Sequence, residues 1–150
     1  YYDYSTENIK EIFITLSELS KKHNFQLVII PSMRTPTNII QYTKEYFGDD
    51  HTVIMDVDKK AYLSSLAIAQ NIVVTCDSSS MISEAALTGK PIYVASILPK
   101  KNDKRFQKFR NLFRKLNIIK NLGEEIKDWN YEKLDETNRV ANIIKQKINL

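Results

Sequence analysis

Short runs of β-branched and other apolar residues alternate along the chain with longer segments of helical periodicity. The runs lie at residues 25–31, 52–57, 72–76 and 91–96, with a shorter one at 117–120. Nearly continuous apolar runs of this length are typical of strands buried on both faces of a parallel sheet. Helices are expected between them, because parallel strands need a crossover connection. This alternation restricts the chain to few architectures.

The segments around these runs repeat apolar residues at helical spacing. They are residues 5–22, 36–47, 60–70, 81–87, 103–116 and 135–148. Ser5 or Thr6 can cap the first helix, and Pro36 suits the first turn of the second. The pattern predicts an α/β fold with a Rossmann-like, doubly wound and mostly parallel sheet. Residues 1–150 have the length of one such domain, and residues 123–131 resemble a linker.

Composition excludes several classes of protein. No apolar run approaches the roughly 18 residues that a membrane-spanning helix needs, so an integral membrane protein is not expected. Cys76 is the one cysteine, which excludes a disulfide framework and indicates a reducing compartment such as the cytoplasm. His23 and His51 are too few for a zinc cluster of His and Cys ligands.

The segment TCDSSSMISEAALTGKP at residues 75–91 is the strongest functional signal. Its polar residues end a predicted strand and open a helix, where ligands of parallel α/β sheets bind. The candidate binding residues are Asp77, Ser78, Ser80, Ser83 and Glu84. Backbone N–H groups, hydroxyls and the helix dipole favour a diphosphate there, and a carboxylate one turn further in can accept hydrogen bonds from a ribose diol.

An ordinary helix start is the alternative interpretation of this segment. Asp and Ser are common capping residues, and Ser80 with Ser83 or Glu84 fits a capping box. Both interpretations stay open at this point.

The loop SMRTP at residues 32–36 follows another buried run and is expected at the same edge of the sheet. The guanidinium of Arg34 can form bidentate hydrogen bonds to a phosphate, and Ser32 and Thr35 can add hydrogen-bond donors to the same site. Arg34 is therefore the candidate for stabilising a leaving diphosphate, and no other catalytic residue is assigned. A solvated surface arginine is the alternative.

These motifs resemble the elongated-mitochondria, or mitochondrial fission, family. The resemblance covers about residues 25–145 and rests on S-x-R-T-P at 32–36, D-S-x-S-M-x-S-E-A-x-x-T-G-K-P at 77–91 and R-F-x-x-F at 105–109. It continues in Trp129, Tyr131, Leu134, Glu136, Thr137, Arg139, Val140 and Ala141. The chain departs from the family at Arg110, where histidine is expected.

The resemblance implies a nucleoside-diphosphate-sugar glycosyltransferase of the two-domain GT-B fold, with this chain as the carboxyl-terminal, donor-binding half. It implies that Glu84 binds the ribose, that Ser78 and Ser80 bind the diphosphate, and that Arg34 binds the phosphates or the base. No metal cofactor is implied. The chain begins at Tyr1 without a leader and enters a helix almost at once, so we expect it to lack its first strand and the acceptor domain.

The acceptor domain or a partner chain would then complete the enzyme, and the isolated chain is expected to be inactive. The alternative function is a non-catalytic interaction or recruitment module of the same family that keeps the fold.

Two further features have ordinary explanations. Asp56 and Asp58 resemble the D-x-D pair that holds a divalent cation against a diphosphate, but a solvated turn with a helix cap is favoured. Cys76 precedes Asp77, yet no histidine lies near it in sequence to activate it, so a buried strand cysteine is favoured over a reactive thiol.

Positive charge is concentrated in residues 90–120, which hold ten Lys or Arg against one acid, Asp103, although the whole chain carries only +4. The apolar residues of 103–116 share one helical face, and the basic residues are expected opposite them, Arg110 included. A solvated covering helix is one interpretation. An anionic membrane surface that meets the chain between Lys100 and Lys115 is the other, and nucleic acid is not expected as a partner because no stacking aromatics lie among these charges.

Overall fold

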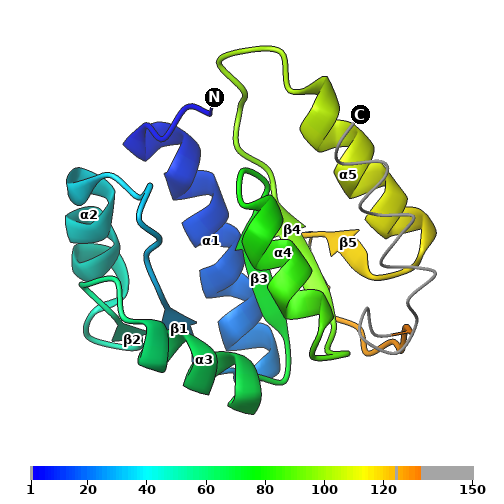
Figure 1. The fold of residues 1–150 in the computed structure, drawn as a ribbon. Coiled ribbons are helices and arrows are strands. Elements are labelled where there is room, and N and C mark those ends of the chain that lie inside the picture. The colour runs from blue at the N-terminus through cyan, green and yellow to red at the C-terminus, as the bar shows by residue number, and fades with distance from the viewer. Residues whose placement is uncertain (1, 124, 133–150) are drawn as a thin grey trace. The chain divides into compact units, whose positions relative to one another are not determined.

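The computed structural model describes residues 2–123 and 125–132. Its contacts divide the chain into two compact units, and each unit contains a parallel sheet (Figure 1). The amino unit is Tyr4–Ile68, and the carboxyl unit is Tyr1–Asp3 together with Ala69–Leu150.

The amino unit alternates helices with two very short strands. Its elements are α1 (Thr6–His23), β1 (Val28–Ile29), α2 (Thr37–Phe47), β2 (Thr52–Val53) and α3 (Lys59–Ile68). The strands are parallel, with Val28 opposite Thr52. Ser5 caps α1 by accepting a hydrogen bond from the N–H of Asn8 at 3.3 Å, and Asn24 ends the helix in the left-handed region with φ 55°.

The carboxyl unit has a three-stranded sheet in the order β3–β4–β5, with both pairings parallel. Its elements are β3 (Ile72–Thr75), α4 (Ser79–Ala86), β4 (Ile92–Ala95), α5 (Lys104–Lys115) and β5 (Ile119–Asn121). Every residue of the central strand β4 is buried. Helix α4 packs on β3 and β4, and α5 packs on β5 and against α4. The core between them includes the wholly buried Ile82 and Phe113.

The predicted α/β fold with parallel strands is confirmed, although the strands form two sheets. The strands β1 and β2 are much shorter than the apolar runs 25–31 and 52–57, because only two residue pairs are in register. The helix predicted at 135–148 lies outside the described residues, and the single-domain assignment stays a prediction. Among residues 2–123 and 125–132, no helix has both the length and the apolar character that crossing a membrane requires.

Residues 125–132 are hydrogen-bonded to the carboxyl unit. The prediction of a linker at residues 123–131 is therefore wrong. The hydroxyl of Tyr93 donates to the carbonyl of Lys127 at 2.8 Å and accepts from its N–H at 2.6 Å. The indole of Trp129 donates to the carbonyl of Asn117 at 2.8 Å. Asn117 lies just before β5, so the segment is held close to the amino end of that strand.

Tyr131 makes the stability of the folded chain depend on pH. Its hydroxyl donates to the carbonyl of Lys90, and burial raises the pKa of Tyr131 to about 12 from 10.0. Because the folded state favours the neutral phenol, this contribution to stability is complete below about pH 10 and is lost as the pH rises from about 10 to about 12. We expect Tyr131→Phe to reduce the loss of stability between these pH values, measured by urea unfolding.

The reduction should be partial, because burial also raises the pKa of Tyr2 and the pKa of Tyr93. Tyr46→Phe, which removes a phenol of the amino unit, is the matched control. An alkaline transition that is identical in Tyr131→Phe and the unmodified chain would contradict the prediction.

Candidate functional site

Helix α4 begins directly beyond the carboxyl end of β3, and its N-cap side chain makes no capping hydrogen bond. The N–H of Ser78 donates to the carbonyl of Thr75 at 3.1 Å and closes the connecting turn. Ser78 occupies the N-cap position, and its side chain makes no capping hydrogen bond. The N–H of Ile82 donates to the carbonyl of Ser78 at 3.0 Å, so the amides of residues 79–81 come before the first helical bond of this kind. This turn therefore offers N–H donors at the positive end of the helix dipole.

The polar side chains of this segment have different surroundings. Asp77 and Ser78 are buried, whereas Ser80 and Glu84 are exposed. Ser80 and Glu84 are four residues apart and so lie on one face of α4, one turn of about 5.4 Å from each other. Ser83 donates its hydroxyl hydrogen to the carbonyl of Ser79 at 3.0 Å.

The capping-box interpretation is wrong. A capping box would need the side chain of the N-cap residue to bond to the helix, and the side chain of Ser78 makes no such bond. Ser80 lies inside α4, and Ser83 bonds back along the helix. Ser80 and Glu84 are therefore the side chains best placed to meet a ligand from solvent.

The 32–36 loop is a self-contained turn of the amino unit. The hydroxyl oxygen of Thr35 accepts from the N–H of Ser32 at 2.9 Å, and the two hydroxyls lie 3.3 Å apart. The hydroxyl oxygen of Ser32 accepts from the N–H of Arg34 at 3.3 Å. Ser32 and Thr35 thus shape the turn, and Arg34 is left exposed.

The predicted site residues fall in different units. Ser32, Arg34 and Thr35 belong to the amino unit, and the residues from Asp77 to Glu84 belong to the carboxyl unit. The expectation that both sets line one edge of a sheet stays a prediction.

The ordinary explanation of the aspartate pair is supported. The carboxylate of Asp58 accepts from the N–H of Ala61 at 3.1 Å, in the first turn of α3. Within residues 2–123 and 125–132, no group of three or more His, Cys, Asp or Glu side chains could hold a metal ion.

Cys76 is buried, as predicted, but it lies in the turn directly beyond β3 and not in the strand itself. Its sulfur accepts from the N–H of Ile97 at 3.2 Å, and its own N–H donates to the carbonyl of Ala95 at 2.9 Å. Burial raises the pKa of the Cys76 thiol, which disfavours the reactive thiolate.

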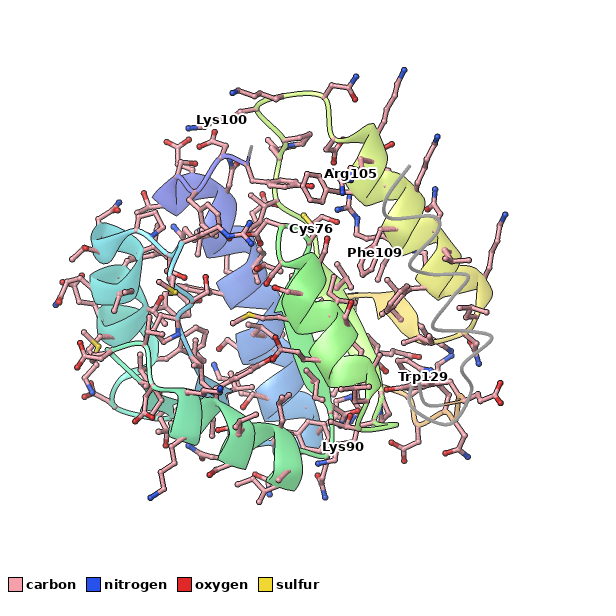
Figure 2. All side chains as sticks on the ribbon, in the orientation of Figure 1. Cys76, Lys90, Lys100, Arg105, Phe109 and Trp129 are labelled. Carbon is pink, nitrogen blue, oxygen red and sulfur yellow. The ribbon has the colours of Figure 1, made fainter. Side chains whose placement is uncertain are left out.

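A buried polar cluster at this end of the sheet is absent from the sequence predictions. Arg110 is only 7% exposed and donates to the Cys76 carbonyl at 2.9 Å and to the Tyr2 hydroxyl at 3.1 Å. Its other terminal nitrogen lies 3.1 Å from the carboxylate of Asp103, which is 6% exposed. Burial alone would lower the pKa of Arg110, but the hydrogen bonds that Arg110 donates to Tyr2 and Asp103 outweigh it, so the pKa is raised. Figure 2 shows Cys76 beyond the end of β3.

The assignment of Arg110 to the solvated face of α5 is therefore wrong. At about 100° per residue, Arg110 lies about 60° from Phe113 but about 120° from Lys104, so a helical wheel places it nearer the apolar face. Asp103 is at the N-cap position of α5 but makes no side-chain capping bond, because its carboxylate accepts from Arg110, Tyr2 and Gln107. The remaining expected charges on the outer side of α5, Lys104, Arg105, Lys108 and Lys115, are exposed.

Comparison with known proteins identifies relatives of the chain. A family model described as mitochondrial fission ELM1 matches residues 1–148. An uncharacterized protein of Rickettsia prowazekii (strain Madrid E), RP120, is 33% identical over 93% of this chain and 41% of its own length. Mitochondrial fission protein ELM1 of Arabidopsis thaliana is 29% identical over 78% of this chain and 28% of its own length. No solved structure matches the chain. The chain thus spans less than half the length of these curated relatives.

Proposed function

The chain belongs to the mitochondrial fission ELM1 family, and from that premise we propose that it forms the donor-binding part of a glycosyltransferase that uses a nucleoside-diphosphate sugar. The observation that carries the proposal is the first turn of α4. It combines N–H donors with no side-chain cap, a serine hydroxyl and a carboxylate one turn further along the same helix face.

The diphosphate would bind the amides of residues 79–81 and the hydroxyl of Ser80, where the helix dipole favours negative charge. Glu84 would accept hydrogen bonds from the two ribose hydroxyls. Arg34, together with Ser32 and Thr35, would meet the phosphates or the base from the amino unit. Sugar transfer would be assisted by donors that stabilise the charge developing on the leaving diphosphate. No metal is required by this scheme.

The proposal assigns no acceptor-binding residues to this chain. Because the curated relatives are more than twice as long, the residues that bind and activate the acceptor would come from a further domain or a partner chain. A cytoplasmic location would give such an enzyme access to nucleotide sugars.

Calorimetric titration of the chain with UDP, GDP and their sugars tests the proposal. We expect at least one to bind, and Glu84→Gln to weaken it about tenfold, as loss of a charge-assisted hydrogen bond would. Ser80→Ala should weaken it by a smaller factor. Glu45→Gln makes the same chemical change at an exposed site of α2 and should leave the affinity unchanged. Absence of binding to every compound at millimolar concentration would overturn the proposal.

A non-catalytic recruitment module is the second candidate. The plant relative is named for mitochondrial fission and not for sugar transfer. In that case Glu84→Gln and Arg34→Ala would leave function in the organism intact, whereas the glycosyltransferase proposal requires both to impair it.

A further inference from the structure

The outer side of α5 and the loop before it form a surface whose exposed charged side chains are all basic. Its members, called the basic face below, are Lys100, Lys101, Lys104, Arg105, Lys108 and Lys115. All six are exposed. Along α5, Lys104, Lys108 and Lys115 fall within about 40° of one another and form one stripe. Figure 2 shows Lys100 in the loop and Arg105 near the start of α5.

The one acid of this segment is buried and does not lie at its surface. Asp103 is the only acid of residues 90–120, and it is buried in an ion pair with Arg110 at 3.1 Å. Neutralised and covered, Asp103 cannot offset the charges around it. Within residues 90–120, the exposed charges are therefore all positive.

An apolar side chain projects from the same loop. Leu98 is 63% exposed and lies two residues before Lys100. The loop backbone around it is fixed: the carbonyl of Leu98 accepts from the N–H of Asp3 at 2.7 Å, and Pro99 forms an antiparallel bridge with Tyr2. A leucine held out in water beside lysines matches a membrane interface, which accepts an apolar side chain between anionic headgroups.

Two of the three aromatic residues of α5 disfavour nucleic acid as the partner. Phe109 and Phe113 are buried against the sheet, so their rings are not available to stack on bases. We propose that the basic face docks on a bilayer surface that carries anionic lipid, with Leu98 entering the headgroup region. This attachment needs no nucleotide and stands independently of the proposed sugar transfer.

Sedimentation of the 150-residue chain with lipid vesicles tests the proposal. The chain should bind vesicles of phosphatidylcholine mixed with phosphatidylserine and not vesicles of phosphatidylcholine alone. Raising the salt from about 0.1 M to about 1 M should release it, because the Debye length falls from about 10 Å to about 3 Å. Lys104→Glu combined with Lys108→Glu should lower the partition coefficient at least about tenfold.

A matched control separates the basic face from general charge attraction. Lys21 and Lys22 are exposed neighbours in the last turn of α1, and reversing both changes the net charge by the same amount. This pair should alter binding less than about twofold, whereas Leu98→Ser should lower it about fivefold without any change of charge. Far-ultraviolet circular dichroism of each variant verifies that it is folded.

Any of four results would overturn the proposal. The first is no binding to the anionic vesicles. The second is an equal loss in the Lys21/Lys22 and Lys104/Lys108 double variants, and the third is no loss in Leu98→Ser. The fourth is displacement of the chain from anionic vesicles by double-stranded DNA at equal phosphate concentration, which would make nucleic acid the preferred partner.

Discussion

Replacing Arg110 by methionine should lower the free energy of unfolding by about 3–5 kcal/mol, as breaking a buried ion pair does. The variant would leave the carboxylate of Asp103 buried without its cation. It would also remove the donor to the Cys76 carbonyl and to the Tyr2 hydroxyl. Urea unfolding followed by the fluorescence of Trp129, the chain's one tryptophan, reports on the unit that contains the cluster.

Arg114→Met is the matched control, because it makes the same change one turn further along α5. Arg114 bonds only to the exposed side chains of Asn111 and Asn121 among the partners that the structure shows, and its loss should lower stability by less than about 1 kcal/mol.

A double variant isolates the ion pair. Asp103→Asn combined with Arg110→Met should be less destabilised than the sum of the two single variants, because it removes both charges together. Equal losses in Arg110→Met and Arg114→Met would contradict the structural role given to the cluster.

Phe13→Ala should have a comparable effect in the amino unit, lowering the free energy of unfolding by about 3–5 kcal/mol. Phe13 is 6% exposed, and its ring centroid lies 4.9 Å from that of Phe47, 5.4 Å from Tyr46 and 5.5 Å from Tyr42. The change would open a cavity at the contact between α1 and α2 and remove three aromatic pairs.

Circular dichroism during urea unfolding measures the loss, and amide hydrogen exchange in α1 and α2 locates it. Phe13→Leu should lose less than about 1.5 kcal/mol, because leucine keeps most of the volume. Ile14→Ala changes the next residue of the same helix, which is 40% exposed, and should have a small effect. If Ile14→Ala and Phe13→Ala were equally destabilised, the aromatic cluster would not be the centre of this unit.

Hydrophobic patterning was sufficient to predict the parallel strands and the helices of the described residues. The run IYVA of β4 is buried along its whole length, as a central parallel strand requires, and the apolar spacing of 5–22 matches α1 closely. The number of residues over which two strands pair could not be predicted from the same pattern. Residues 25–31 and 52–57 are mostly apolar, yet only two pairs of β1 and β2 form, because partner geometry decides how far a ladder extends.

The candidate site was predictable only in part. The position of residues 77–84 beyond a strand followed from the alternation of elements. Whether Ser78 caps α4 did not, because the choice depends on the turn geometry, here φ −107° and ψ 76°. Arg110 was misplaced because charge was taken as a sign of exposure, whereas its partners Tyr2 and Asp103 lie 108 and 7 residues away in sequence. The pair with Tyr2 is long-range, and such pairs leave no local pattern.

The hydrogen bond between Tyr2 and Asp103 joins residues 101 positions apart. In sequence, the amino unit is thus an insertion within the carboxyl unit. The carboxyl unit contains the residues that precede the insertion and those that follow it. An unfolded insertion would make closure of this large loop entropically unfavourable, whereas a compact one shortens the path between its ends. The order of folding follows from this connectivity: the Tyr2 end of the chain is expected to join the carboxyl unit late, after the intervening residues have become compact.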